Sequence, residues 1–183
     1  MTENQRLNQV NESLKKKFKG KKLIFGSGFI GAKVVFVGEA PGPDEEKDGK
    51  PMSGHSEKIL NQLLRTLGIN KNKIYLTNVL KYNTAGKKIP TLKEIRSYVP
   101  FLKEEIKTIG PKVVVTLGNM ALTGIGLRQP LDNIHGRVFN FGSYELLPTF
   151  HPLHAAKDPQ IKTLIQNDLT KLKELLSREV QEA

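Results

Sequence analysis

The sequence predicts an α/β protein, a three-layer α/β/α sandwich around a mainly parallel, four-stranded central sheet. The first observation is a set of continuous β-branched runs bounded by glycine or polar residues: KVVFVG at 33–38, KIYLTNV at 73–79 and KVVVTLG at 112–118. Such runs are typical of strands buried on both faces. The second observation is that helical patterns lie between these runs. This alternation favours parallel strands joined by crossover helices.

Residues 1–30 are expected to form a basic N-terminal arm, ahead of the main domain at residues 31–183. The arm begins with a polar helix up to about residue 20 and continues into a hairpin-like lead-in, LIFGSGFIGAK at 23–33. The chain has 183 residues, 38% of them hydrophobic, which suits one sizeable core. We therefore expect a single domain overall.

The helices follow from the spacing of apolar residues. SEKILNQLLRTLGI at 56–69 places its leucines and isoleucines on one face. TLKEIRSYVPFLKEEIKTIG at 91–110 begins with a capping box in which Thr91 and Glu94 are the partners. LGNMALTGIG at 117–126 indicates a turn into a third helix, and residues 136–150 indicate two strands around a Gly-Ser turn. A long amphipathic helix is expected at 158–180.

Composition excludes several classes of protein. With no cysteine there is no disulfide, no thiolate nucleophile and no cysteine-ligated metal centre, and four histidines leave little for a zinc site, so we expect no metal and no cofactor. No run approaches the roughly 20 apolar residues of a membrane helix, and the N-terminus is too polar for a signal peptide. We expect a soluble protein of the prokaryotic cytosol or nucleoid, with no membrane partner. No feature demands a dimer, so a monomer is expected.

The charge indicates a polyanionic partner. The formal net charge is +11, and clustered lysines and arginines gain affinity by releasing counterions from phosphates. Nucleic acid is the first expectation. The stretch NESLKKKFKGKK at 11–22 also fits a solvated tail, so charge alone does not decide the function.

Four polar clusters follow the predicted strands. They are Gly38-Glu39-Ala40-Pro41-Gly42, Thr77-Asn78, Leu117-Gly118-Asn119 and Thr149-Phe150-His151-Pro152. Each has an ordinary explanation when taken alone: a solvated glutamate, a capping asparagine, a structural histidine. Parallel strands bring their carboxyl ends to one edge of the sheet, where α/β proteins bind ligands. The sequence therefore predicts that these clusters converge on one cleft.

The order of these segments resembles a known family. VVFVGEAPG, DGKPMSGHSEKILNQLL, IYLTNVLKY, PTLKEIRSYVPFLKEEI, PKVVVTLGNMAL and LPTFHPL together resemble the uracil-DNA glycosylase superfamily, most closely its family 4 enzymes, over about residues 33–175. The resemblance implies a monofunctional glycosylase that flips uracil, a deaminated cytosine, out of DNA and hydrolyses its N-glycosidic bond. The expected partner is DNA that contains uracil or another deaminated base.

The resemblance also implies roles for particular residues. Glu39 would position or activate the water, His151 would donate a hydrogen bond to a uracil oxygen, and Asn78 would pair with the uracil edge. Other contacts to the base are expected from Ala40, Pro41, Gly42 and Met52. Contacts to DNA are expected from Asp44, His55, Lys81, Gly118, Arg137, Pro152, Leu153 and His154. Of these, Leu153 or His154 would wedge into the gap left by the flipped nucleotide.

The sequence departs from the family 4 pattern at two places. Typical members carry four cysteines that bind a 4Fe-4S cluster, and two of those positions hold Tyr82 and Tyr98 here, whereas the N-terminal pair is missing. We expect the two tyrosines to pack against apolar residues near 18–29 instead. The second departure is Met52, which stands where family members usually have a phenylalanine that stacks on the flipped base.

These departures leave alternatives open. One is a glycosylase for another deaminated or damaged base such as hypoxanthine. Another is a DNA-binding paralogue without turnover, which would bind DNA tightly and in a salt-sensitive way. A third is an enzyme acting on small phosphates or nucleotides, although neither a GxGxxG nor a Walker pattern is present.

Overall fold

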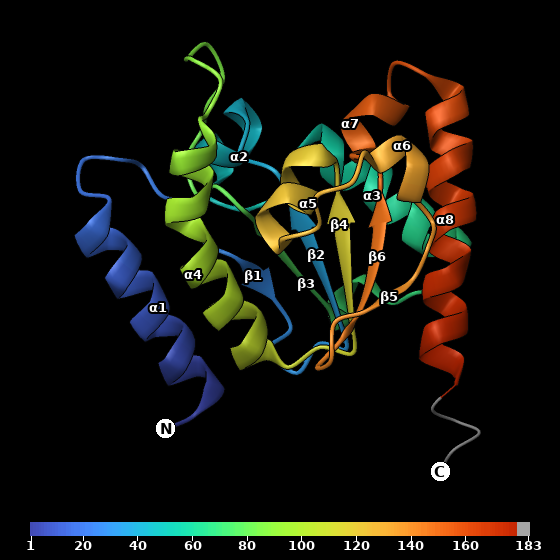
Figure 1. Ribbon diagram of the computed structural model, residues 1–183, viewed down its shortest axis with the longest axis horizontal. Helices are drawn as coiled ribbons and strands as arrows, with labels where there is room; N and C mark the ends of the chain where they lie inside the picture. Colours follow the sequence, from blue (N-terminus) through green and yellow to red (C-terminus); the bar gives the residue numbers. More distant parts are fainter. Residues whose placement is uncertain (179–183) are drawn as a thin grey trace.

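The computed structural model describes residues 1–178 and contains a six-stranded sheet in the order β1-β3-β2-β4-β6-β5 (Figure 1). The central strands run parallel: β3 (Ile74–Asn78), β2 (Val34–Gly38), β4 (Val113–Leu117) and β6 (Glu145–Thr149). The predicted α/β/α class and its four-stranded parallel core are confirmed. The sheet has more than the four strands predicted, because two-residue antiparallel strands, β1 (Ser27–Gly28) and β5 (Phe139–Asn140), extend its edges. Strands β5 and β6 are the two strands expected around the Gly-Ser turn, which confirms that prediction. The lead-in segment is not a hairpin, since β1 pairs with β3.

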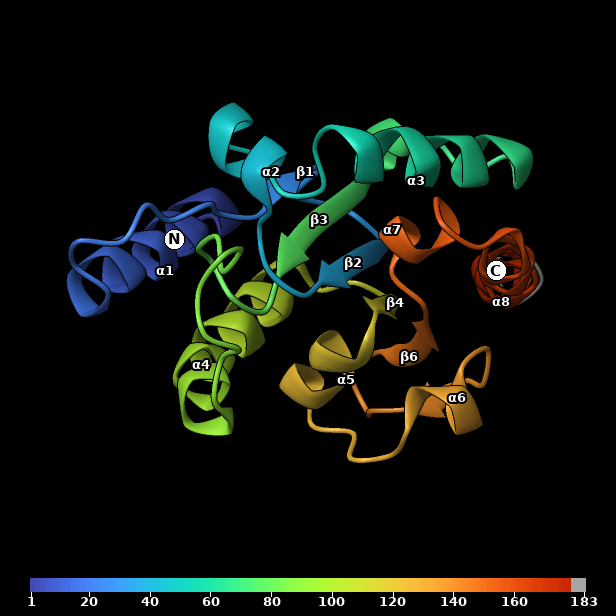
Figure 2. The same cartoon turned by 90° about the horizontal axis from the view of Figure 1, so that it is seen from above.

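Helices cover both faces of the sheet (Figure 2). One layer holds α1 (Glu3–Lys17), α4 (Leu92–Ile109), α5 (Asn119–Ile125) and α6 (Leu131–Ile134). The other holds α3 (His55–Thr66), α7 (Pro152–Ala155) and α8 (Pro159–Ser177). The short helix α2 (Pro43–Asp48) follows the carboxyl end of β2, and a 3-10 turn, η1 (Lys71–Lys73), precedes β3. No helix in the described part of the chain is long and apolar enough to cross a membrane.

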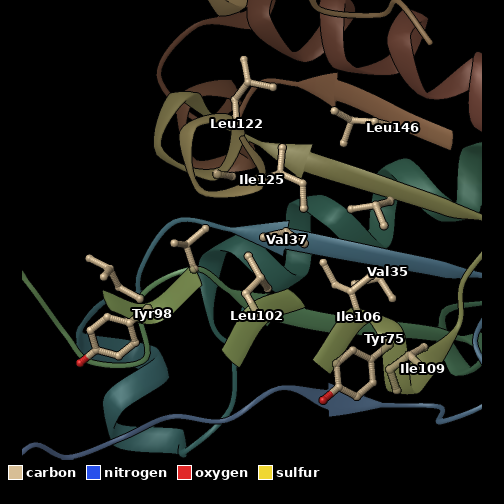
Figure 3. Packing of buried hydrophobic residues seen from close by; sticks show 14 of the residues in the cluster. Val35, Val37, Tyr75, Tyr98, Leu102, Ile106, Ile109, Leu122, Ile125 and Leu146 are labelled. Carbon is tan, nitrogen blue, oxygen red and sulfur yellow. The ribbon is translucent and has the colours of Figure 1, made fainter. Parts of the chain in front are cut away.

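Two apolar clusters lie on the two faces of the sheet. Alternate side chains of one strand enter different clusters, because successive residues of a strand point to opposite faces. Val35 and Val37 of β2 pack with α1, α4 and α5, whereas Val34 and Phe36 pack with α3 and α8. Figure 3 shows the first cluster, with Leu102 and Ile106 of α4 close to Val35 and Val37.

The helix ends follow the capping signals. Thr91 Oγ1 accepts a hydrogen bond from Glu94 N at 3.2 Å, and α4 ends at Gly110, whose φ of +64° suits glycine. Asp158 caps α8 through Gln160 N at 2.9 Å. The helix expected at 158–180 is confirmed up to Ser177, and residues 179–180 lie outside the described part of the chain.

An aromatic cluster occupies the place expected for Tyr82 and Tyr98. The rings of Phe18 and Tyr98 stack with centroids 3.9 Å apart, and the Tyr82 ring lies 6.0 Å from that of Tyr98. Lys21 Nζ lies 3.6 Å from the centre of the Tyr82 ring. The expected aromatic packing near residues 18–29 is therefore confirmed. It ties the N-terminal segment to α4 and to the loop after β3.

Replacing Tyr98 by alanine is expected to lower the free energy of unfolding by about 3–5 kcal/mol, because the ring is fully buried and stacked on Phe18. Urea unfolding followed by circular dichroism measures this change. Tyr98→Phe is the matched control, since the Tyr98 hydroxyl is buried with no hydrogen-bond partner and its removal should cost nothing. A large loss in Tyr98→Phe would contradict this account of the cluster.

Candidate active site

Backbone hydrogen bonds hold the carboxyl ends of the four parallel strands together. Val79 N donates to Gly38 O at 3.1 Å and Leu80 N to Glu39 O at 3.0 Å, which joins the segments that follow β3 and β2. Gly118 N donates to Thr149 O at 2.9 Å, which joins the ends of β4 and β6. The polar residues predicted at these strand ends therefore lie along one edge of the sheet, in the order β3, β2, β4, β6.

Glu39 lies against the first turn of α5. Its Oε2 accepts a hydrogen bond from Met120 N at 2.7 Å, and a β-carbon at Gly118 would lie 2.7 Å from Glu39 Cδ. Only glycine leaves room for the carboxylate there, and Gly118 also has a φ of +99°. Burial raises the pKa of the Glu39 carboxyl, and the Met120 amide and the nearby His154 partly offset this rise. The side chain is fixed, ionisable and half-buried.

Asn78 ends β3 directly opposite Gly38 in the parallel register. Its side chain fills the space that a side chain at position 38 would need, because a β-carbon at Gly38 would collide with Asn78 Oδ1 and lie 3.4 Å from Met52 Sδ. Asn78 is 3% exposed and Met52 is 1% exposed. The Asn78 amide and the Met52 thioether thus both lie over Gly38. That the two residues serve one base pocket stays a prediction.

Met52 has an unusual backbone conformation. Its φ is +58°, and among the non-glycine residues of the described range 1–178 it alone has a positive φ. A bulky side chain in this left-handed region costs about 1–3 kcal/mol and persists where the surrounding structure enforces it, often at functional sites. The surrounding structure thus holds the thioether at the carboxyl edge of the sheet, near Gly38 and the Asn78 amide.

His151 is buried at the start of α7. Its Nδ1 accepts a hydrogen bond from Leu153 N at 3.2 Å, so the proton of the neutral ring is on Nε2. Burial, with a smaller contribution from His154, lowers the pKa of His151 to about 4. The imidazole is therefore neutral near pH 7 and has one N–H to donate.

The loop between β2 and α3 is held by its own side chains. Glu45 Oε2 accepts from Gly42 N at 2.9 Å, so this carboxylate caps α2. Pro41, in the same loop, is buried. Asp44 is exposed and packs against Gly54, where a β-carbon would lie 2.8 Å from Asp44 Cγ. His55 is exposed at the first position of α3. Ala40 and Gly42, in the same loop, are half-buried.

The segment after His151 presents an apolar residue at the surface. Leu153 is 45% exposed and lies between buried Pro152 and exposed His154 in α7. Arg137 is placed elsewhere: it lines a hollow with Lys171, Glu174 and Arg178 of the C-terminal part of the chain. The structure does not bring Arg137 together with Glu39, Asn78 and His151.

The prediction that Lys81 contacts DNA is wrong. It was expected to contact phosphate, but it is 1% exposed and its Nζ lies 2.7 Å from Glu105 Oε2. An ammonium group that is buried and paired in this way cannot reach a DNA backbone. A lysine in a loop is usually at the surface. Lys81 is buried and pairs with Glu105, which lies 24 residues further along the chain and gives no local signal of this contact.

Two buried carboxylates behind the strand ends were missed from the sequence. Glu105 of α4 accepts from the Thr77 hydroxyl at 2.9 Å, and Asp168 of α8 accepts from the Thr149 hydroxyl at 2.6 Å. Asp168 also lies 2.9 Å from His135 Nδ1. A signal for Glu105 existed, since it takes a core-facing position between Leu102 and Ile109.

Comparisons with known proteins identify the family of the chain. Residues 25–173 match the sequence model of the uracil DNA glycosylase superfamily. The chain belongs to this superfamily. It is 32% identical over 160 residues to the Type-4 uracil-DNA glycosylase of Sulfurisphaera tokodaii, covering 82% of this chain and 73% of the relative. It is 31% identical over 162 residues to the Type-4 uracil-DNA glycosylase of Thermotoga maritima, covering 86% and 84%.

The 4Fe-4S cluster implied by the family 4 resemblance does not fit this superfamily member. The sequence has no cysteine, and two of the positions hold Tyr98, whose ring stacks on Phe18, and Tyr82, whose ring lies tilted beside that of Tyr98. Fe-S clusters are held by cysteine thiolates, for which phenol rings packed in an apolar cluster are no substitute.

Proposed function

We propose that the protein is a monofunctional DNA glycosylase that hydrolyses the N-glycosidic bond of uracil in DNA. One observation carries the proposal: Asn78 ends β3, Glu39 directly follows β2 and His151 lies two residues after β6, all at the carboxyl edge of the sheet, with Met52 Sδ near Gly38 and the Asn78 amide. Family membership and the names of the relatives support it.

Recognition of uracil is assigned to Asn78. A base inside a duplex exposes little of its Watson–Crick edge, so the nucleotide must first turn out of the stack into the pocket. The Asn78 amide offers a donor and an acceptor, which match the carbonyl and the imide N–H of uracil. Cytosine presents the opposite pattern and would leave a buried amide unpaired, at a cost of about 1–3 kcal/mol.

Departure of the base is assigned to His151. Breaking the bond between C1′ and N1 leaves negative charge on uracil and positive charge on the sugar. The neutral imidazole donates its Nε2 proton in a hydrogen bond toward a uracil oxygen, and a fixed donor in a buried site stabilises such charge strongly. Burial keeps the ring neutral, and the Leu153 amide keeps the proton on Nε2.

Attack by water is assigned to Glu39. Its carboxylate is held by the Met120 amide through one oxygen, which leaves the other oxygen to orient a water. The water adds to C1′ as the bond to N1 breaks, and its proton passes to the carboxylate. Glu39 then gives up this proton through solvent, the departing uracil anion takes one up, and the products are free uracil and an abasic site. The negative charge of Glu39 also stabilises the developing sugar cation.

The remaining expected contacts belong to this proposal. Ala40, Pro41 and Gly42 would line the base, and Asp44, His55, Gly118, Pro152, Leu153 and His154 would face the DNA. Exposed Leu153 is the candidate for the wedge residue.

We also propose that the protein acts as a single-domain monomer, because α1 packs on α4 in the same core. We propose further that it works in the prokaryotic cytosol.

The test is a cleavage assay on labelled oligonucleotides that contain uracil, inosine or a normal base pair. After incubation, alkali breaks the strand at abasic sites. We expect breaks in the uracil strand with the wild type and none with the normal strand. An intact uracil strand would overturn the proposed function, and tight salt-dependent binding without breaks would indicate a non-catalytic DNA-binding protein.

A second candidate function is favoured by Met52, which replaces an aromatic ring with a narrower, flexible side chain beside Asn78. Such a pocket is less selective for the shape of the base. Release of hypoxanthine from the inosine strand, with little release of uracil, would favour this candidate.

Met52→Phe tests the role of this side chain. If contact with the base limits uracil release, the aromatic ring should raise kcat/KM by about 5- to 10-fold, since stacking on a base contributes about 1–3 kcal/mol. The measurement is kcat/KM on single-stranded uracil DNA. Met52→Leu is the matched control, because it keeps the apolar volume without a ring and should stay near wild type. A lower rate in Met52→Phe would indicate a pocket shaped for another base.

A further inference from the structure

A buried ion pair lies behind the strand end that carries Asn78, and the reaction described above does not use it. Lys81 Nζ and Glu105 Oε2 are 2.7 Å apart, with side-chain exposures of 2% and 4%. Removing two charges from water costs free energy that their pairing repays only in part, so such a pair is weak evidence for stability. Its location next to a recognition residue points to a different role.

Glu105 holds residues on both sides of Asn78. The Thr77 hydroxyl, one residue before Asn78, donates to Glu105 at 2.9 Å. Lys81, three residues after Asn78, donates to Glu105 at 2.7 Å and to Thr77 Oγ1 at 2.5 Å. The Tyr75 hydroxyl adds a further hydrogen bond to Glu105 at 2.9 Å. One carboxylate on α4 therefore fixes the end of β3 and the start of the loop that follows it.

The backbone between these anchors is held from the neighbouring strand. Val79 N and Leu80 N donate to the carbonyl oxygens of Gly38 and Glu39. Thr77 points toward α4, and Asn78 points to the opposite face, toward Gly38 and Met52, as the alternation of a strand requires. Residues on both sides of Asn78 are thus fixed by side chain or backbone, and its amide lies over Gly38, on the same face of the sheet as Met52.

We propose that Glu105, acting through Thr77 and Lys81, is a positioning residue that fixes the orientation of the Asn78 amide. The inference rests on the proposed function, because it names what orients the group that reads uracil. An amide that reads a base must hold its donor and acceptor in a fixed plane. A displacement of about 1 Å in a reacting or recognition group lowers rates by about 100-fold.

The sharpest variant is Thr77→Val, which keeps the shape of the side chain and removes the hydroxyl. We expect kcat/KM on uracil DNA to fall by about 10- to 100-fold, and inhibition by free uracil to weaken by a similar factor. Affinity for undamaged DNA should not change, since no phosphate contact is touched. Thr77→Ser keeps the hydroxyl and removes only the methyl group, so kcat/KM and inhibition by free uracil should both stay near wild type. If packing of the methyl group were what mattered, Thr77→Ser would be the variant that loses them.

A double variant tests the ion pair itself. Glu105→Gln alone leaves a buried ammonium without its partner and can prevent folding, so Lys81→Met is combined with it to remove both charges. The same loss of kcat/KM and of uracil inhibition is expected. Leu102→Ala is the matched control on α4, because Leu102 is fully buried and makes none of these hydrogen bonds. It should lower Tm and keep kcat/KM at temperatures where it is folded.

The outcomes separate the two proposals. If the wild type releases uracil and both Thr77→Val and the double variant keep its kcat/KM and its inhibition by uracil, the positioning role is wrong and the function stands. If the wild type releases no uracil, the function fails, and the positioning role is decided by NMR. The side-chain amide signal of Asn78, assigned by its loss in Asn78→Ala, should shift or broaden in Thr77→Val but not in Thr77→Ser. An unchanged signal would overturn the inference.

Discussion

Replacing Glu39 by glutamine is expected to lower kcat for uracil release by about 10²- to 10⁴-fold, the range for loss of a general base. Glutamine can still accept the hydrogen bond from Met120 N, so the position of the side chain is kept. It cannot take a proton from water and carries no charge to stabilise the sugar cation. Single-turnover rates with excess enzyme, measured by alkaline strand cleavage, report this step without interference from binding.

The control for Glu39→Gln is Glu46→Gln, which removes the charge of a carboxylate on the neighbouring helix α2 and should leave the single-turnover rate near wild type.

The dependence of stability on pH provides a second readout for Glu39→Gln. Burial raises the pKa of Glu39, so the folded protein binds this proton more tightly than the unfolded chain, and stability falls as pH rises through the folded pKa. The Tm gain of Glu39→Gln over wild type should therefore be larger at pH 7 than at pH 4. A full rate in Glu39→Gln would remove Glu39 from the mechanism.

Replacing His151 by asparagine is expected to lower kcat by about 10²- to 10³-fold, the usual effect of losing one hydrogen-bond donor to a developing anion. Asparagine is chosen because its side-chain oxygen can cap α7 and accept from Leu153 N, so the local fold is kept. The same single-turnover assay measures the change. A rate within a few-fold of wild type would show that another group stabilises the departing base.

The low pKa of His151 gives this variant a distinct pH signature. The folded pKa of about 4 lies below the ordinary value of 6.5, so the unfolded chain binds this proton more tightly than the folded protein. Wild type should lose up to about 3 kcal/mol of stability from this group as pH falls from 6.5 through 4. His151→Asn should lack that part of the loss. Urea unfolding at pH 7, 5.5 and 4 distinguishes the two curves.

Much of the fold could be predicted because its signals are local. Val34–Gly38 and Val113–Leu117 are apolar throughout and bounded by glycine or polar residues, so strands and their carboxyl ends follow directly from the sequence. Once the strands are parallel, Glu39 and Asn78 must lie at one edge of the sheet. The Gly-Ser turn at 142–143 indicated β5 and its partner β6, whereas β1 carries no comparable signal, because two residues are too few to show an alternation.

The parts of the site that could not be predicted depend on contacts between distant segments. The local sequence predicts that Lys81 is a surface residue, whereas in the fold α4 places Glu105 against it. The Met120 amide becomes a partner of Glu39 because β2 and β4 are neighbours. The positive φ of Met52 is unexpected from its residue type, since the left-handed region favours glycine, and tertiary structure imposes it. Such features follow from packing and not from local propensity.

Aromatic packing among residues 18, 82 and 98 should make the maturation of this protein independent of iron supply. The chain should reach its native state in aerobic buffer with chelator present, and oxidants that dismantle inorganic clusters should leave its thermal transition unchanged. A cell that is starved of iron, or under peroxide attack, would then keep this repair capacity when cluster-dependent proteins fail.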